Sequence, residues 1–546
     1  MRFSRRRLVT AALAALGLAA VPVLAGPRGA LAATTTFTVT TAADPTSGTA
    51  CPATGTSPCS LRAAVTAANT TGGSVVIQFA VAGPFNLGAT GELFVNGGEQ
   101  LTVQGAPDGS TVINGPAADR VIGEAPPGSS SSCPTAHTSL TLQHVTISGG
   151  HAALNNTTSD DGYGGGVDVN CGNALSVVDS TFSGNNAASG GGAIDDNTTG
   201  AVTLVRTTIS GSVAAGTTPA DGGGAIQSSS GANLTIVDST VTGNRTAFQG
   251  GAIYAISGAS VALTNDTISG NTASASAGPV GGVFAEANAA TTAANSIVAG
   301  NGTNCMGVIT DGGHNLEDGT SCGFSSSAVN GDPKLDSLKA NGGPTMTMAL
   351  KPGSPAIAAG DDTVCAAPAG GNGLDQRSVT RPQGKHCDIG AFEVVATTTA
   401  LSAPTTSAPG DTLTLTAMVT PKQAVPGQPA GTVTFLDGST VLGTAALGGA
   451  SPDTATFTLA TVAAGSHPLT ARFEQTPLFL ASTSAPVALA VAAAATPAPV
   501  TPPPGVISTP NSAAAAPSAG GSGLLGMGVL AGGAVAVRRL RGRSTR

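Results

Sequence analysis

Residues 234–243 read LTIVDSTVTG, and four further segments of the chain repeat this pattern of apolar and polar residues. The other copies are LTLQHVTISG (140–149), LSVVDSTFSG (175–184), VTLVRTTISG (202–211) and VALTNDTISG (261–270). Apolar residues such as Leu234, Ile236 and Val241 are separated by Thr, Ser and Asp, which predicts short strands and not helices. The copies begin 27 to 35 residues apart, a spacing typical of solenoids and repeat arrays.

Glycine-rich segments lie between these copies. They read GGGAI at 190–194 and 222–226, GGAI at 250–253 and GGVF at 281–284. Glycine permits tight corners with positive φ, and one short unit cannot bury its own apolar face unless neighbouring units stack on it. We therefore predict an all-β fold whose main body is a right-handed parallel β-helix. A β-propeller is the alternative, but its blades need about 40 to 45 residues and aromatic motifs that this chain lacks.

The segments before the repeats predict earlier coils and a cap. Residues 75–80, 101–104 and 111–114 have the composition of strands, whereas residues 59–69 (CSLRAAVTAAN) predict a short amphipathic helix. Ser60 is suited to cap this helix, because a serine side chain can accept a hydrogen bond from a free backbone N–H. The helix would cover the open end of the solenoid with one apolar face, formed by Leu61, Ala64, Val65 and Ala68.

The composition changes near residue 396. Alternating segments at 412–419, 431–436 and 468–473 predict short strands, and Asp437-Gly438 is a hairpin turn signal. About 95 residues of such strands predict an Ig-like β-sandwich. No cysteine follows Cys387, so this sandwich lacks an inter-sheet disulfide.

Both ends of the chain have the composition of targeting segments. Arginines at positions 2 and 5–7, an apolar stretch at 8–24 and the small-residue site Ala30-Leu31-Ala32 predict an export signal, by either the twin-arginine or the general secretory route. A Pro-, Ala- and Ser-rich spacer, an apolar stretch at 524–537 and five arginines at the end predict an anchor at the membrane or wall.

These features divide the chain into five predicted parts. The parts are a signal peptide (1–33), the β-helix (34–395), the Ig-like domain (396–492), a disordered Pro/Ala-rich linker (493–521) and a short hydrophobic anchor with a basic tail (522–546). Within the β-helix, we expect an N-terminal cap at 51–80 and a distinct C-terminal region at 305–393.

Eight cysteines follow the export signal, in the oxidising surroundings where disulfides persist. Eight cysteines allow 105 pairings, and locality along the chain favours four of them: Cys51–Cys59, Cys133–Cys171, Cys305–Cys322 and Cys365–Cys387. Zinc is the competing interpretation, but the chain has neither a C-x-x-C motif nor paired histidines at ligand spacing.

Several segments resemble known parts of bacterial surface proteins. Residues 59–69 resemble the CSLREA-type motif, with Ala63 in place of its Glu, and residues 373–393 (GLDQRSVTRPQGKHCDIGAFE) resemble the choice-of-anchor Q signature, with Ser378 in place of its Gly. The GGAI segments are similar to those of polymorphic outer-membrane proteins and related autotransporter-like β-helices. Residues after 396 resemble group 3 bacterial Ig-like domains. This resemblance implies a pectate-lyase-like β-helix displayed at a cell surface, without implying a particular activity.

Composition and architecture together predict a secreted, surface-anchored protein and not a metabolic enzyme. The formal net charge is −8, and the basic residues that cluster lie at the two ends, so a nucleic-acid partner is not expected. We expect adhesion or structural display at the envelope. The expected partners are the cell envelope, through the C-terminal tail, and an extracellular polysaccharide or another cell surface.

The alternative function is a polysaccharide lyase or glycoside hydrolase that acts on one face of the β-helix. Such chemistry needs paired carboxyl groups, or acidic calcium ligands beside a base, and its candidates here are Asp195, Asp196, Arg206 and Arg245. The simpler interpretation places acidic residues such as Asp179 and Asp238 at solenoid turns, on its surface. With no Trp and two Tyr, the chain has few platforms for sugar rings. No cofactor is expected, and calcium at Asp and Asn turns is the one weak candidate.

Overall fold

The computed structural model describes residues 34–45, 51–52, 58–88, 91–124, 136–154, 162–276, 278–324, 329–368, 371–425, 427–448 and 453–494. The predicted signal peptide, most of the linker, the hydrophobic anchor and Cys133 lie outside these residues. Among the described residues, no helix is long and apolar enough to cross a membrane.

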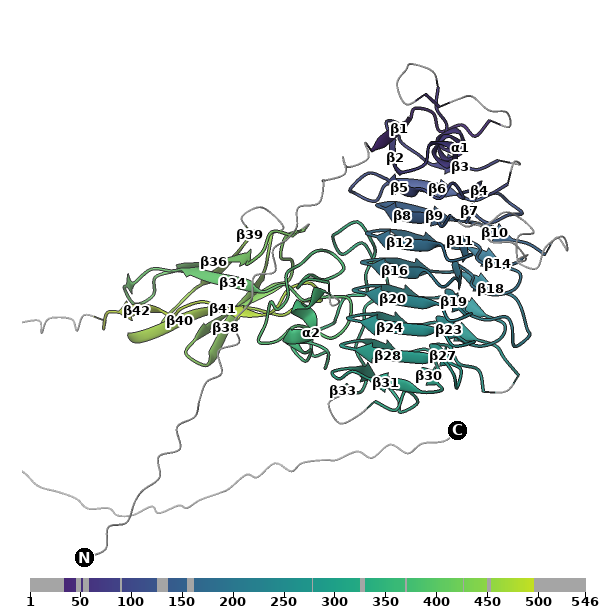
Figure 1. The fold of residues 1–546 in the computed structure, drawn as a ribbon. Helices are drawn as coiled ribbons and strands as arrows, with labels where there is room; N and C mark the ends of the chain where they lie inside the picture. Colours follow the sequence, from purple (N-terminus) through teal and green to yellow (C-terminus); the bar gives the residue numbers. More distant parts are fainter. Residues whose placement is uncertain are drawn as a thin grey trace, which may run out of the picture. The chain divides into compact units, whose positions relative to one another are not determined.

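The main body is a parallel β-helix, as predicted (Figure 1). It is built from four parallel sheets. Sheet A has ten strands: β1 (Thr35–Val39), β2 (Ser74–Phe79), β5 (Gln100–Gln104), β8 (Ser139–Gln143), β12 (Ala174–Val178), β16 (Ala201–Val205), β20 (Asn233–Val237), β24 (Ser260–Thr264), β28 (Ala290–Ala294) and β31 (Ile309–Asp311). Sheet B also has ten: β3 (Phe85–Asn86), β6 (Thr111–Asn114), β9 (Val145–Ser148), β13 (Thr181–Ser183), β17 (Thr208–Ser210), β21 (Thr240–Thr242), β25 (Thr267–Ser269), β29 (Ile297–Ala299), β32 (Leu316–Glu317) and β33 (Val329–Asn330).

The other two sheets complete each coil. Sheet D has five short strands: β10 (His151–Ala152), β14 (Asn186–Ala187), β18 (Val213–Ala214), β22 (Arg245–Thr246) and β26 (Thr272–Ala273). Sheet C has eight: β4 (Leu93–Phe94), β7 (Ile122–Gly123), β11 (Val167–Asn170), β15 (Ile194–Asn197), β19 (Ile226–Ser228), β23 (Ile253–Ala255), β27 (Val283–Ala285) and β30 (Cys305–Met306). The chain passes through the sheets in the order A, B, D and C before the next coil begins.

The core consists of aliphatic side chains that stack from coil to coil. Leu204 pairs in register with Ile236, and Ile209 pairs with Val241. All four side chains are buried in one continuous cluster. Because one coil exposes its apolar row until the next coil covers it, the burial of these rows holds the stack together.

One residue per coil turns the chain from sheet A to sheet B in a left-handed conformation. Asp179, Asp238 and Asn265 have φ values of 50°, 47° and 56°. Asn and Asp tolerate this region better than most residues do, which explains their recurrence at the corner. His144, Arg206, Asn295 and His314 occupy the same corner in other coils.

Buried asparagines form a ladder at the corner between sheets B and D. The backbone N–H of Asn244 donates to Asn271 Oδ1 (3.0 Å), and that of Asn271 donates to Asn301 Oδ1 (3.0 Å). The Nδ2 atom of Asn271 in turn donates to the carbonyl of Val241 (2.9 Å). Each asparagine therefore satisfies backbone groups of a neighbouring coil that would otherwise be buried without partners.

The N-terminal cap agrees with its prediction. Helix α1 (Leu61–Thr71) buries Leu61, Ala64, Val65 and Ala68, and the Ser60 side chain accepts a hydrogen bond from the N–H of Ala63. Arg62 pairs with Asp44 (2.8 Å) and donates to the carbonyls of Gly91 and Glu92. The arginine therefore ties the helix to the coil beneath it.

Three of the four predicted disulfides are present: Cys51–Cys59, Cys305–Cys322 and Cys365–Cys387. Cys171 is disulfide-bonded, and its predicted partner Cys133 lies outside the described residues.

An antiparallel sandwich follows the β-helix, as predicted. One sheet holds β34 (Thr397–Ser402), β36 (Leu413–Pro421) and β39 (Asp453–Leu459). The other holds β35 (Thr406–Ser407), β42 (Val487–Val491), β40 (Gly465–Phe473), β37 (Thr432–Asp437), β38 (Thr440–Ala446) and β41 (Ser482–Thr483). The predicted turn at Asp437-Gly438 joins β37 to β38, and Phe435 and Phe473 are buried between the sheets.

Candidate functional site

The outer face of sheet C presents one side chain per coil at the same register position. Asp195 pairs with Gln227, and Gln227 pairs with Tyr254. The preceding residues Ile194 and Ile226 point into the core, so the next position points outward. We call this set the outer row; from β11 to β30 its members are Asp168, Asp195, Gln227, Tyr254, Phe284 and Met306.

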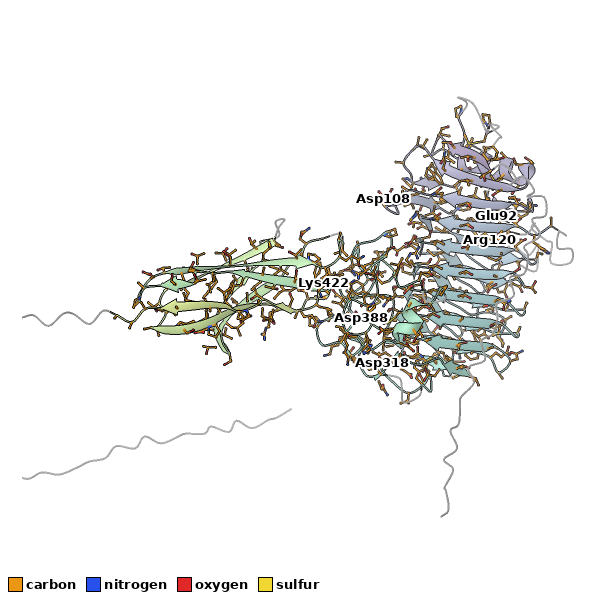
Figure 2. The ribbon with its side chains drawn as sticks, turned by 60° about the vertical axis from the view of Figure 1, so that its left-hand side comes forward. Glu92, Asp108, Arg120, Asp318, Asp388 and Lys422 are labelled. Carbon is orange, nitrogen blue, oxygen red and sulfur yellow. A yellow bond between two sulfur atoms is a disulfide. The ribbon has the colours of Figure 1, made fainter. Side chains whose placement is uncertain are left out.

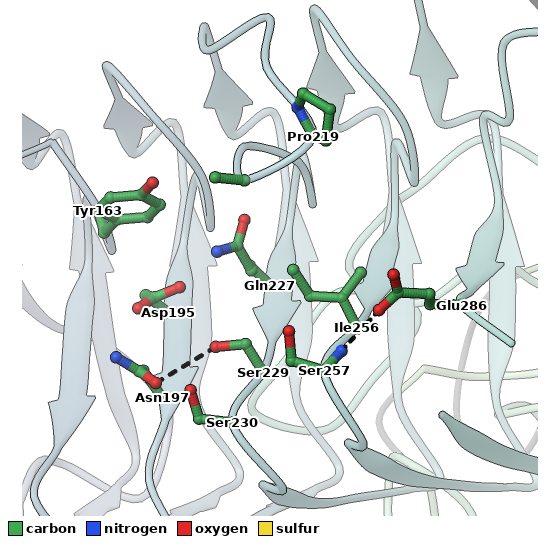
Figure 3. Close-up of a pocket in the computed structure, with 11 residues that line it drawn as sticks. Tyr163, Asp195, Asn197, Pro219, Gln227, Ser229, Ser230, Ile256, Ser257 and Glu286 are labelled. Atoms are coloured by element: carbon green, nitrogen blue, oxygen red, sulfur yellow. Dashed lines mark hydrogen bonds between the residues drawn. The ribbon is translucent and has the colours of Figure 1, made fainter. Parts of the chain in front are cut away.

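A polar groove of about 480 Å³ runs along part of this face. Figure 3 shows Tyr163 and Asp195 near one end, Gln227 in the middle and Glu286 at the other end. The groove is also lined by Asn197, Pro219, Ala220, Ser229, Ser230, Ile256 and Ser257. Hydroxyl, amide and carboxyl groups from successive coils therefore face one continuous groove.

Both tyrosines of the chain hold the loop that forms one wall of the groove. Tyr163 donates its hydroxyl to Asp221 Oδ1 (3.1 Å), and Tyr254 donates to the carbonyl of Pro219 (2.9 Å). Asp221 also accepts two hydrogen bonds from Thr218. Burial and the neighbouring Asp221 raise the pKa of Tyr163, so its phenol keeps the proton that it donates. The loop is thus fixed on both sides.

The first glycine of each GGGAI segment makes room for the outer row. A Cβ at Gly190 would lie 2.0 Å from Oε1 of Gln227, and one at Gly222 would lie 2.4 Å from the ring of Tyr254. These contacts are shorter than van der Waals packing allows. The glycines are therefore needed because the large side chains of the following coil pack against their backbone.

A charged cluster adjoins the groove on the N-terminal side of the same face. Arg120 contacts Asp168 and lies 3.4 Å from Glu92, and Figure 2 shows Glu92 and Arg120 side by side. Burial raises the pKa of Glu92 to about 7, although the positive charge of Arg120 opposes this shift. Burial by itself would lower the pKa of Arg120, but the charges of Asp168 and Glu92 outweigh it. Glu92 therefore titrates near neutral pH beside a fixed cation.

A second group of acidic residues faces the interior of the β-helix. Asp196 is fully buried and accepts a hydrogen bond from the Ser228 hydroxyl (2.9 Å). Burial raises its pKa to about 7. Burial also raises the pKa of Glu99 and Glu124, whose carboxyl oxygens have no hydrogen-bond partner among the described residues. The carboxyl groups of Asp196 and Glu124 lie on the opposite side of sheet C from the groove.

The structure does not bring the four candidate catalytic residues into one cleft. Asp195 lies on the outer face of sheet C and Asp196 faces the interior, because adjacent strand residues point to opposite sides. Arg206 lies at the corner between sheets A and B, where it forms a bidentate pair with Asp179 (2.7 and 2.8 Å). Arg245 lies in sheet D.

Asp179 and Asp238 lie at turns, as predicted, but both are buried, so the predicted surface position is wrong, most clearly for Asp238. Its side chain is fully buried, and its Oδ1 atom lies 3.2 Å from Arg381, which comes from a segment much later in the chain. Arg381 is also fully buried and lies 3.2 Å from Glu393. Gln376 secures the same segment, since it bonds the hydroxyls of Thr208 (2.8 Å) and Thr240 (2.6 Å) at the ends of sheet B strands.

The C-terminal part of the β-helix therefore folds back over sheet B. It includes helix α2 (Asp362–Ala366) and residues 373–393. Gln376 and Arg381 are buried and hold this segment against the β-helix, so their role is structural. No sequence pattern predicted that they lie opposite Thr208 and Asp238.

Within the described residues, no three His, Cys, Asp or Glu side chains gather closely enough to hold a metal ion. The residues that line the groove are candidates for binding an organic ligand. Asp195 is the one of them that the sequence predicted as a candidate, whereas Tyr163, Gln227 and Glu286 were not predicted. Aligning the GGAI segments would have found Gln227, because the outer row directly follows the last apolar residue of each segment.

Comparison with known proteins identifies one part of the chain. Residues 398–492 match the family model of the bacterial Ig-like domain (group 3). No curated protein and no solved structure matches the chain. The Ig-like domain and the disulfides indicate an extracellular protein, and the Ig-like domain with the β-helix indicates a surface or structural role.

Proposed function

We propose that this protein is a surface adhesin whose β-helix binds extracellular polysaccharide through the groove on sheet C. The groove itself is the observation that carries this proposal. It is lined by Tyr163, Gln227 and Ser229, among others, and these offer an aromatic ring and hydrogen-bonding groups to a polyhydroxylated ligand. Its lining comes from successive coils, so an extended polymer can lie along the solenoid axis.

The remaining segments support display at the envelope. We infer that helix α1 and Arg62 form a CSLREA-type cap, and that Gln376 and Arg381 belong to a choice-of-anchor Q region. In support, Arg62 joins the cap to the first coils, and the two later residues clamp the C-terminal segment to sheet B. The proposed signal at 1–33 would export the chain, and the tail at 522–546 would anchor it; both lie outside the described residues.

Cleavage of the bound polysaccharide is the second candidate function. The observation that favours it is Glu92, whose pKa of about 7 suits a general acid or base at neutral pH. Glu92 lies beside Arg120 and Asp168, on the same face as Asp195. The cluster is largely buried, so this candidate requires a polymer that reaches Glu92 beyond the groove lining.

A matched pair of variants tests the proposal. The mature chain would be screened against a panel of polysaccharides, and both binding and new chain ends would be measured. Ala220→Trp places an indole in the groove, whereas Ala201→Trp adds the same group at an exposed position of sheet A. We expect Ala220→Trp to abolish binding and Ala201→Trp to preserve it.

Two outcomes decide between the candidate functions. Unsaturated products or new reducing ends that disappear in Glu92→Gln would establish cleavage. Binding that Ala220→Trp leaves intact would place the ligand outside the groove and overturn the proposal.

A further inference from the structure

The groove is lined by acidic residues and by no basic one. Asp195 lies near one end, and Glu286, an exposed residue, lies at the other end. Glu286 Oε2 accepts a hydrogen bond from the N–H of Ser257 (2.8 Å), which fixes the direction of the carboxyl group. No Lys, Arg or His belongs to the groove lining in the described part of the chain.

The surroundings of the groove are acidic too. Arg120 lies beside this face, and it contacts Asp168 and Glu92. The acidic side chains on or beside the face are Glu92, Asp119, Asp168, Asp195, Asp221 and Glu286. The face therefore has an excess of negative charge, which repels anionic polymers and attracts cations.

The two carboxyl groups in the groove are spaced along the polymer's expected path. Three steps between neighbouring strands separate β15, which carries Asp195, from β27, which Glu286 follows. At the usual spacing of strands, these steps span about 14 Å. One polymer can therefore lie over both positions. An ammonium beside the exposed Glu286 would form a charge-assisted hydrogen bond, whereas the largely buried Asp195 contributes mainly through its charge.

We infer that the groove selects a polysaccharide of amino sugars with free, protonated amines and rejects polyuronates. This inference rests on the proposed function, because it names the ligand class of the same groove. The Tyr163 ring adds to the selectivity, because an aromatic face attracts ammonium groups.

Three probes of equal length test this inference on the mature chain. They are glucosamine oligomers with free amines, the same oligomers after N-acetylation, and polygalacturonate. We expect the free-amine oligomers to bind at least about tenfold more tightly than the other two, because hydrogen bonds between charged groups are the stronger ones. Glu286→Gln should weaken that binding about tenfold, since the variant keeps an acceptor but loses the charge.

Asp108→Asn is the matched control, because it removes an exposed carboxyl charge away from the groove. It should leave the affinity unchanged. If Asp108→Asn weakens binding as much as Glu286→Gln does, the attraction is non-specific and the inference is wrong. If acetylated oligomers or polygalacturonate bind best, and Ala220→Trp blocks them, the ligand class is wrong while the proposed function stands. If no polysaccharide binds, both are wrong.

Discussion

Replacing Ser212 with Asn should stabilise the β-helix by about 1 to 2 kcal/mol, because Ser212 interrupts the asparagine ladder. Ser212 occupies the ladder position between Asn185 and Asn244, as the register of β14, β18 and β22 shows. Its side chain is buried, and its hydroxyl has no hydrogen-bond partner in the described part of the chain. The longer amide side chain would restore the missing contacts.

The expected gain in stability follows from the hydrogen bonds that asparagines form in the neighbouring coils. Asn271 accepts from the N–H of Asn244 and donates to Val241 O (2.9 Å) and Asn301 Oδ1 (3.1 Å). Asn at position 212 would form the three equivalent bonds, each worth about 1 kcal/mol net. Ordering the longer side chain would offset about 1 kcal/mol of this gain. For a domain of this size, the expected rise in Tm is about 1 to 3 °C.

Thermal unfolding followed by circular dichroism measures this shift. Asn271→Ala is the companion variant, and it should lose about 3 to 5 kcal/mol because it leaves buried backbone groups without partners. If Ser212→Asn lowers the Tm while Asn271→Ala behaves as expected, the corner has no room for the amide. If neither variant changes the Tm, the ladder does not stabilise the solenoid and the reasoning is refuted.

Three further predictions concern buried acids, the C-terminal clamp and a disulfide. The pKa of Asp196 is raised to about 7 in the folded state, so the protein should lose stability as pH rises from about 4 to 7. Asp196→Asn should reduce this loss. If the wild-type protein and the variant show the same change in Tm between pH 5 and pH 8, the assignment is contradicted. Arg381→Met should lower the free energy of unfolding in urea by about 3 to 5 kcal/mol, because the carboxyl groups that Arg381 binds stay buried without a cation. An unchanged midpoint of urea unfolding would argue against the clamp. Replacing Cys305 and Cys322 together by Ala should cost about 3 kcal/mol in oxidised protein, and added reductant should abolish the difference.

The repeated coils, the N-terminal cap and a hairpin of the Ig-like domain could be predicted because their signals are local. Apolar residues such as Leu204 and Ile209 recur at the same place in each unit, and stacking gives them one core. The cap helix needed only a serine followed by apolar residues on one face. The hairpin at Asp437-Gly438 likewise depends on two adjacent residues.

The candidate site was harder to predict because its residues meet through stacking. Asp195 and Asp196 are adjacent in sequence but point to opposite sides of sheet C, so the pair is not a catalytic dyad. Tyr163 and Asp221 meet across 58 residues. Arg381 and Asp238 meet across 143 residues, through a segment without repeats. No periodicity within the sequence predicts such contacts.

Hydrogen–deuterium exchange of the mature chain, with and without the bound polysaccharide, tests the central claim most directly. Binding in the groove should slow exchange in peptides that contain Asp195, Gln227 and Ser257, which lie on three successive coils of one face. Exchange in sheet A and in the Ig-like domain should stay unchanged. Protection confined to either of those regions, with the groove peptides unaffected, would contradict the account.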